Sequence, residues 1–316
     1  MNIEDLLRET LSDMAHEEQP PPPDRFVQVR RGRPRGRGLA LVAAAAVTAM
    51  AVGSTLVSQG LSSSRDAAGQ GPGTASVETG RGRITLTVRE GLRLSQVLER
   101  LSAATGRPQA EFGRAAKDGG ALGLPPYARG ALEGFAFPGT YEVPSTSSPG
   151  EILAAMVTRF NRVAGDGDLV AGARRAGRTP LEILIIASIV QAESADKRDM
   201  PKIARVVHNR LDHTPGLRLQ LDSTVLYGLG KYGAKASQED LRSRSPYNTY
   251  ARRGLPPGPI CNPGADAIAA ALKPAAGPWL YFVTTDPKRG VTKFAASEAE
   301  FLELTKEYRR NLGKAG

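Results

Sequence analysis

Apolar and polar residues alternate over residues 83–88, RITLTV, so that every second side chain is apolar. This period of two predicts a strand with one buried face. The pattern then changes to helical spacing, which predicts a helix with Ser95 as a possible N-cap and a stop at Gly106. We expect a second short helix near 110–117 and a returning strand at 140–143, TYEV.

Two later segments carry the signature of a helix start. Each places Ser or Thr before Pro, with Glu at the third helical position, in SPGE at 148–151 and TPLE at 179–182. The first helix continues with apolar residues on one face, so we expect it to lie on a core. The second is apolar on nearly every side from Ile183 to Val190, which predicts a helix that is buried all round.

Glu193 follows this buried helix by about one turn. A carboxyl group in that position is expected to be partly desolvated, and it lies near the negative end of the helix dipole. Both effects raise the pKa of a carboxyl group. A raised pKa suits a general acid that works near neutral pH. Many buried helices nevertheless end in a surface glutamate, so the position alone leaves both interpretations open.

The N-terminal part of the chain has a different pattern. Residues 38–64 contain no charged side chain, and 38–61 is long enough to cross a hydrocarbon core of about 30 Å as one helix. Arginines precede this segment at positions 25, 30, 31, 33, 35 and 37. By the positive-inside rule they keep residues 1–37 in the cytoplasm and place the rest outside the cell. We therefore expect a single-pass membrane anchor; the alternative is a cleaved signal peptide, whose apolar core is shorter.

Composition changes this picture little. The chain has 316 residues, of which 41% are hydrophobic and 23% charged, as in a globular protein with room for two modest domains. The arginine run supplies much of the formal net charge of +10, so the charge is weak evidence for nucleic acid, and we expect no nucleic-acid partner. Cys261 is the single cysteine, which excludes an internal disulfide.

Six segments follow one another at short intervals between residues 132 and 283. They are LEGFAFPGTYEVP, ASIVQAES, KIARVVHNRL, LRLQLDSTVLYGLG, SPYNTYARRGLPPGPICNPG and ALKPAAGPWLYFV. The fifth segment is the most specific, because its string of Pro, Gly and Asn residues is not explained by the formation of a helix or a strand. Together the segments closely resemble the endolytic murein transglycosylases of the YceG-like family, over roughly residues 83–316.

The patterns and the resemblance together predict an α+β fold class and five parts. These are a cytoplasmic tail at 1–37, a transmembrane helix at 38–61, a linker at 62–82, a small LysM-like α+β subdomain at 83–145 and a YceG-like catalytic domain at 146–316. LysM-like modules grip N-acetylated glycan chains. A small packing module would show the same order of strand, two helices and strand, so that alternative stays open.

The resemblance implies a lytic transglycosylase, a lyase that needs no activated water. It would cut bonds between N-acetylmuramic acid and N-acetylglucosamine in nascent peptidoglycan strands, leave a 1,6-anhydro end and so limit strand length. Glu193, in QAES, matches the catalytic acid of the family's Glu-x-Glu-Thr string. It would first protonate the leaving oxygen and then take the proton of the muramyl O6. Three positions depart from the family pattern, Gln191 for Glu, Gly139 for Asp and Thr292 for His.

Polar and aromatic residues of the neighbouring segments are the candidate substrate-binding residues. Asp222 is also the rival for a second catalytic group, although we favour a structural or positioning role for it. The full set is Gln220, Asp222, Tyr227, Tyr247, Asn248, Tyr250 and Asn262.

No metal or organic cofactor is expected, since His208 and His213 are five positions apart rather than the four of a zinc-binding helix. The expected partners are glycan strands and the cell membrane, with cell-wall synthases or divisome proteins as candidates. Two other function classes stay open. One is a non-catalytic, membrane-anchored peptidoglycan-binding protein, and the other is a cytoplasmic small-molecule lyase, which the predicted span at 38–61 argues against.

Overall fold

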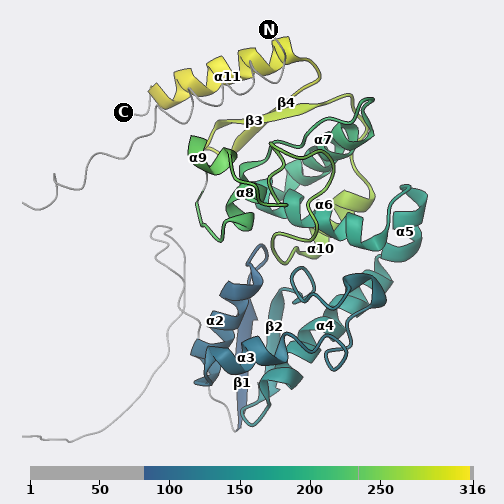
Figure 1. Cartoon of the computed structure of the whole chain (residues 1–316), viewed down its shortest axis with the longest axis vertical. Helices are drawn as coiled ribbons and strands as arrows, with labels where there is room; N and C mark the ends of the chain where they lie inside the picture. Colours follow the sequence, from purple (N-terminus) through teal and green to yellow (C-terminus); the bar gives the residue numbers. More distant parts are fainter. Residues whose placement is uncertain (1–81, 234, 314–316) are drawn as a thin grey trace, which may run out of the picture. The chain divides into compact units, whose positions relative to one another are not determined.

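The structure is a computed structural model and describes residues 82–233 and 235–313 (Figure 1). The predicted tail at 1–37, the predicted transmembrane helix at 38–61 and nearly all of the predicted linker lie outside the described residues. Within the described ranges, no helix combines the length and the apolar character that crossing a bilayer requires.

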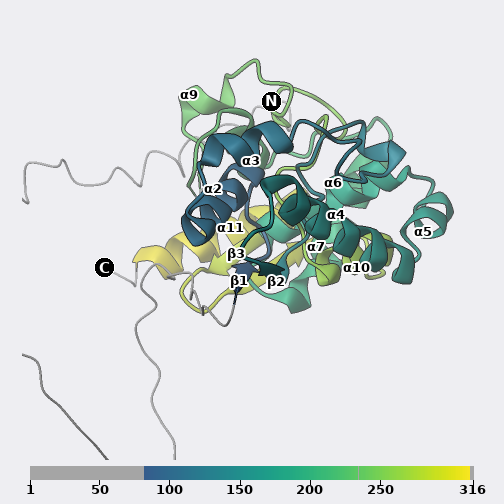
Figure 2. The same cartoon turned by 90° about the horizontal axis from the view of Figure 1, so that it is seen from below.

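The first described elements run in the predicted order of strand, helix, helix and strand. Strand β1 (Arg83–Val88) pairs antiparallel with β2 (Gly139–Pro144), and the register places Leu86 opposite Tyr141. Between them lie α2 (Leu94–Thr105), α3 (Gln109–Ala115) and the short 3-10 helix η2 (Pro126–Ala128), with α2 and α3 side by side (Figure 2).

The predicted N-cap Ser95 is wrong: α2 begins at Leu94 with Arg93 at its N-cap, so Ser95 lies within the first turn. The helix ends as predicted at Gly106, whose φ of 70° is the left-handed conformation that favours glycine. The pairing of β1 with β2 confirms the predicted returning strand.

Both predicted capping boxes are present. Helix α4 (Pro149–Asp166) begins after Ser148, and α6 (Pro180–Glu193) begins after Thr179. In each case the Glu carboxylate accepts from the cap backbone N–H at 2.7 Å. These reciprocal bonds satisfy donors that a helix start leaves without partners. Helix α5 (Leu169–Arg175) lies between α4 and α6 in the chain.

Helix α6 lies at the centre of the described fold. Every residue from Ile183 to Val190 is buried, as predicted, and α6 packs against α5, α7, α8 and α10. The single polar residue in this stretch, Ser188, donates to Ile185 O and accepts from Ile260 N–H. Buried side chains of β1, α2, α4, α6, α7 and α10 belong to one continuous apolar cluster. The boundary between 83–145 and 146–316 therefore stays a prediction.

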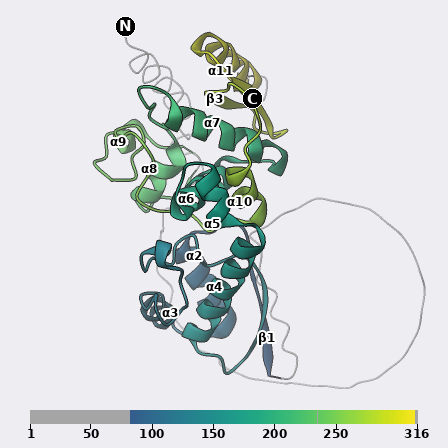
Figure 3. The ribbon, with the colours of Figure 1, turned by 90° about the vertical axis from the view of Figure 1, so that its right-hand side faces the viewer.

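The remaining elements follow α6 in the chain. A short 3-10 helix, η3 (Lys197–Asp199), leads into α7 (Met200–Asp212), followed by α8 (Asp222–Gly228), α9 (Gln238–Leu241) and α10 (Ala265–Leu272). The chain ends in a hairpin of β3 (Tyr281–Asp286) and β4 (Val291–Ala295) and in α11 (Glu298–Gly313). Helix α11 packs along β3, as Figures 1 and 3 both show. This mixture of helices and two small antiparallel sheets is the predicted α+β class.

Candidate active site

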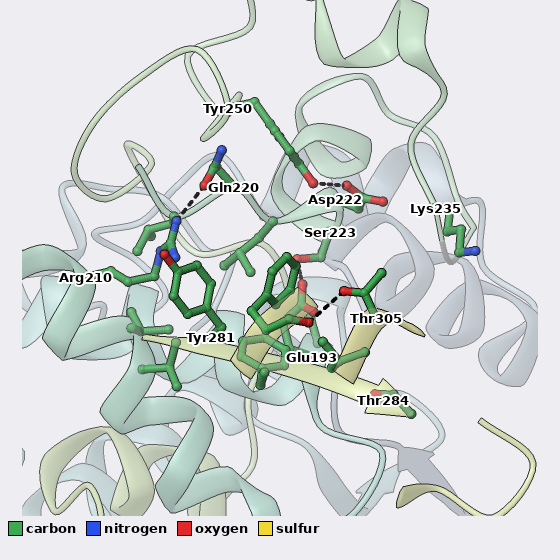
Figure 4. Close-up of a pocket in the computed structure, with 18 of the residues that line it drawn as sticks. Glu193, Arg210, Gln220, Asp222, Ser223, Lys235, Tyr250, Tyr281, Thr284 and Thr305 are labelled. Atoms are coloured by element: carbon green, nitrogen blue, oxygen red, sulfur yellow. Dashed lines mark hydrogen bonds between the residues drawn. The ribbon is translucent and has the colours of Figure 1, made fainter. Parts of the chain in front are cut away.

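A cavity of about 500 Å³ opens where α6 ends (Figure 4). Its walls come from the end of α6, from α7, from the 219–223 segment, from β3 and from α11. The volume falls in the range of small-molecule sites, which is roughly 300–1,000 Å³. Four of the eight candidate site residues line it: Glu193, Gln220, Asp222 and Tyr250.

Glu193 is the last residue of α6, and the Ser223 side chain of α8 lies directly beside it (Figure 4). The Ser223 hydroxyl donates to Glu193 Oε1 at 2.5 Å. The pKa of the Glu193 carboxyl is raised to about 7: burial is the largest cause, the negative charge of Asp222 adds to it, and the Ser223 hydrogen bond opposes both. Glu193 can therefore be protonated near neutral pH and yet lose its proton readily.

Asp222 differs from Glu193 because both of its carboxylate oxygens accept a hydrogen bond from the protein. Its Oδ1 accepts from the Tyr250 hydroxyl at 2.6 Å, and its Oδ2 accepts from the backbone N–H of Ala236 at 3.1 Å. Tyr250 is buried, and burial together with the charge of Asp222 holds its pKa well above the usual range, so it remains a donor. Asp222 thus connects α8 to two other segments of the cavity wall.

Arg210 of α7 fixes the opposite side of the cavity. Its buried guanidinium donates to the carbonyls of Arg218 and Leu280 and to Gln220 Oε1, the last at 2.6 Å. Gln220 has a φ of 55°, a left-handed conformation that is rare outside glycine. Because Arg210 holds the amide oxygen of Gln220, the amide N–H groups remain as the donors that Gln220 can offer to a ligand.

The last elements of the chain supply an apolar wall. Phe282 and Val283 of β3, with Phe301 and Tyr308 of α11, line the cavity that holds Glu193. They add apolar surface to the cavity of Glu193, whose pKa is raised by burial. At the rim, Lys235 Nζ donates to the Tyr308 hydroxyl at 2.9 Å.

Three other candidate residues lie around a second buried carboxyl group, Glu133. Tyr227 donates from its hydroxyl to Glu133 Oε2 at 3.1 Å, and the ring centroids of Tyr227 and Tyr247 are 4.8 Å apart. Asn262 donates to Glu133 Oε1 at 3.1 Å, and its own Oδ1 accepts from the backbone of Gly134 and of Ala136. Burial raises the pKa of Glu133 to about 7. None of these residues lines the cavity of Glu193.

Asn248 is completely buried. Its Nδ2 donates to the carbonyls of Leu241 and Ser243, and its Oδ1 accepts from the backbone of Tyr250 and of Ala251. These bonds shape the loop that presents Tyr250 to the cavity. The geometry favours such a supporting role for Asn248 and Asn262, and contact with a substrate stays a prediction for both.

The departures from the family pattern have local partners. Gln191 Oε1 accepts from Gly264 N–H at 3.0 Å, so it ties α6 to the start of α10. Gly139 has a φ of 148°, and a Cβ there would collide with the guanidinium of Arg159, which donates to Thr140 O at 3.1 Å. Thr292 pairs its hydroxyl with that of Thr284, a cavity-lining residue, at 3.3 Å.

The histidines of the described residues make backbone contacts. His208 Nε2 lies 3.0 Å from Ala271 O, and His213 Nδ1 lies 3.1 Å from Pro215 O. Within residues 82–233 and 235–313 no group of three or more His, Cys, Asp or Glu side chains is placed to hold a metal ion.

Comparison with known proteins decides the family. The sequence profile described as the YceG-like family matches residues 70–307, about three quarters of the chain. The chain belongs to the YceG-like family. A crystal structure of a YceG-like protein from Listeria monocytogenes shares this fold, with a TM-score of 0.63 and 30% identity over 70% of this chain and 75% of the other.

Two sequence relatives carry the name endolytic murein transglycosylase. The Bacillus subtilis protein is 38% identical over 155 residues, which are 48% of this chain and 41% of that protein. The Streptococcus pneumoniae serotype 2 protein is 32% identical over 178 residues, which are 55% of this chain and 31% of that protein. The matches thus span less than half the length of these family members.

The sequence patterns did not predict two residues of the Glu193 cavity, Ser223 and Arg210, or the second buried carboxyl group, Glu133. Ser223 lies in the segment LRLQLDSTVLYGLG and Glu133 in LEGFAFPGTYEVP, both of which resemble the family. The sequence therefore indicates that these regions matter, but it does not show which residues Ser223 and Glu133 contact. Arg210 lies in the segment KIARVVHNRL, but the burial that marks it, with only 7% exposed, is visible in the structure and not in the sequence.

Proposed function

We propose that this YceG-like protein is an endolytic peptidoglycan lytic transglycosylase that cuts nascent glycan strands and so limits their length. The names of the Bacillus and Streptococcus relatives support the substrate and the reaction class. The observation that carries the proposal is the environment of Glu193, a carboxyl group with a raised pKa at the end of a buried helix, facing a cavity of about 500 Å³.

Glu193 acts first as an acid. Its proton goes to the oxygen that joins N-acetylmuramic acid to N-acetylglucosamine, and that oxygen leaves with the electron pair of the broken C1–O bond. The muramyl O6 then forms a bond to C1, and the Glu193 carboxylate takes the O6 proton. The products are a free hydroxyl on one strand and a 1,6-anhydro end on the other, and Glu193 is protonated again.

Asp222 supports this division of roles because each of its oxygens accepts a hydrogen bond from the protein. A glycosidase that uses water needs a second carboxyl group free to activate it or to attack the sugar. Here Asp222 accepts from the Tyr250 hydroxyl and from Ala236 N–H, which suits positioning of α8 and of Ser223 rather than activation of a water molecule. Gln220, whose amide oxygen Arg210 holds, is the candidate donor to a sugar carbonyl or hydroxyl.

The location of the enzyme is part of the proposal. The uncharged segment 38–61 and the arginines before it support a single-pass anchor with a cytoplasmic N-terminus and the catalytic part outside. The LysM-like interpretation of residues 83–145, with its glycan contact, also stays a proposal. Protease added to spheroplasts should remove the part beyond residue 62 and spare an epitope at residue 2; release of a processed, freely soluble protein would refute the anchor.

The catalytic proposal is tested by Glu193→Gln, with Glu303→Gln as the matched control. Gln keeps the shape of the side chain but has no proton to transfer, so turnover of purified, uncrosslinked strands should fall by roughly 10²–10⁴-fold. Glu303 on α11 is mostly exposed and forms an ion pair with Lys306, so its substitution should leave turnover unchanged. Circular dichroism checks the fold of both variants. Full activity in Glu193→Gln would refute the assignment of Glu193 as the acid, whereas strand binding without turnover by the wild-type protein would favour the non-catalytic binding function.

A further inference from the structure

Tyr232 has an unusual combination of exposure and fixed position. Its exposed fraction, 59%, is the largest among the large apolar side chains of the described residues. Yet its hydroxyl lies 2.9 Å from Ser95 Oγ, and the guanidinium carbon of Arg93 lies 4.5 Å from its ring centroid. These contacts already restrict the ring, so a ligand that stacks on it loses less affinity to side-chain ordering. We call Tyr232, Arg93 and Ser95 the Tyr232 platform.

Neighbouring side chains fix the position of Arg93 in the Tyr232 platform. The Arg93 guanidinium also lies 5.2 Å from the ring centroid of Tyr227. The Tyr227 hydroxyl donates to Glu133, whose carboxylate also accepts from the backbone N–H of Leu94 at 2.9 Å. The negative charge of Glu133 attracts Arg93. Arg93 is therefore held against Tyr232 by a ring and a buried carboxyl group rather than by solvent-exposed contacts alone.

The platform adjoins the rim of the catalytic cavity. Gly233, the next residue after Tyr232, lines that cavity, and so does Lys235. Adjacent Cα atoms are about 3.8 Å apart, so the Tyr232 backbone lies within one residue of the lining. A cavity of about 500 Å³ takes only a short piece of a polymer, and a longer strand must continue across a rim.

We propose that the Tyr232 platform is a glycan subsite outside the catalytic cavity. A pyranose ring stacks its apolar face on the open face of the Tyr232 ring, while the Ser95 hydroxyl and the Arg93 guanidinium bind sugar hydroxyl or acetamido oxygens. The inference rests on the proposed function, because it places a glycan strand in the cavity of Glu193. It adds a specificity: the platform favours strands long enough to reach from the cavity to Tyr232.

The structural alternative is that these contacts only tie the start of α2 to the 229–233 segment. Three substitutions separate the two interpretations. Tyr232→Ala removes the ring, Tyr232→Phe keeps the ring but removes the hydroxyl, and Ser95→Ala removes the hydrogen bond without touching the ring. If the contacts only connect these two segments, all three substitutions should weaken the connection and lower strand binding equally. If Tyr232 is a stacking subsite, strand binding should depend mainly on its ring.

The experiment uses the full chain carrying Glu193→Gln, so that bound strands are not cut. Calorimetry gives the dissociation constants for a peptide-free tetrasaccharide and for a long peptide-free glycan strand. The quantity of interest is the dissociation constant of the tetrasaccharide divided by that of the long strand. This ratio reports how much the extra length contributes to affinity. Tyr232→Ala should reduce this ratio by about tenfold, the factor that corresponds to ~1.4 kcal/mol. Tyr232→Phe and Ser95→Ala should each reduce it by less than that.

An unchanged ratio in Tyr232→Ala would overturn the subsite, as would equal losses in all three variants or the absence of strand binding in the Glu193→Gln parent. This binding test can succeed or fail independently of the proposed transglycosylase reaction. If the Glu193→Gln protein loses length-dependent binding with Tyr232→Ala while the wild-type protein produces no 1,6-anhydro ends, the subsite stands and the proposed reaction fails.

Discussion

Ser223→Ala removes the hydroxyl group that donates to the proposed catalytic acid. The hydroxyl lies 2.5 Å from Glu193 Oε1 and stabilises the charged form of the carboxyl group, so its loss raises the pKa of Glu193 above about 7. A hydrogen bond to a charged group contributes about 1.5–3 kcal/mol, and one pKa unit corresponds to ~1.36 kcal/mol. Water that enters the cavity replaces part of the lost bond, so we expect a rise of about one unit.

The assay is the pH dependence of kcat/KM for strand cleavage. Because Glu193 must be protonated to start the reaction, activity falls as pH rises through its pKa, and Ser223→Ala should move this alkaline limb to higher pH. Ser194→Ala is the matched control, since the Ser194 hydroxyl has no hydrogen-bond partner among the described residues. A limb that stays in place in Ser223→Ala, or that moves to lower pH, would show that Ser223 does not set the acidity of Glu193.

Three further predictions concern the site and the fold. Asp222→Asn should lower kcat/KM by about 10-fold, less than the roughly 10²–10⁴-fold expected for loss of an acid–base group, and a loss equal to that of Glu193→Gln would make Asp222 catalytic. The folded-state pKa of Glu193 lies above its unfolded value, so its contribution to stability is lost as pH rises from about 4.5 to about 7. Glu193→Gln should therefore raise the melting temperature relative to wild type at pH 8 more than at pH 5, and the reverse order would contradict the raised pKa. Gly139→Ala should lower the free energy of unfolding by about 1–3 kcal/mol, because the φ of 148° is a conformation that residues with a side chain rarely adopt, whereas Gly150→Ala in α4, where a Cβ meets no atom within 4 Å, should not; urea denaturation compares the two.

The regular elements near the site could be predicted from sequence because their signals are local. A capping box consists of four consecutive residues, so it can be identified from a short stretch of sequence. The run from Ile183 to Val190 is apolar on all sides, which predicts a buried helix without information from the rest of the chain. The same run fixes where Glu193 must lie. The alternation over 83–88 and the TYEV segment likewise gave the β1 and β2 pair.

The partners of the site residues could not be predicted, because they are set by segments far apart in the chain. Ser223 meets Glu193 only because α8 packs against the end of α6. Glu133 joins Tyr227 and Asn262 across more than 90 residues, and no periodicity records such a contact. The same limit applies to Asn248, whose polar side chain suggested a sugar contact but is enclosed by the backbone of its own loop.

The central claim is that Glu193 works alone, with the sugar's own O6 as the nucleophile in place of water. Cleavage of purified glycan strands in ¹⁸O-labelled water, followed by mass spectrometry of the products, tests it most directly. The account predicts 1,6-anhydromuramic ends that are lighter by one water than hydrolytic ends and carry no ¹⁸O from the solvent. Reducing muramic ends that contain ¹⁸O would contradict it, because water would then have attacked C1, and Asp222 would become the leading candidate for the base that activates it.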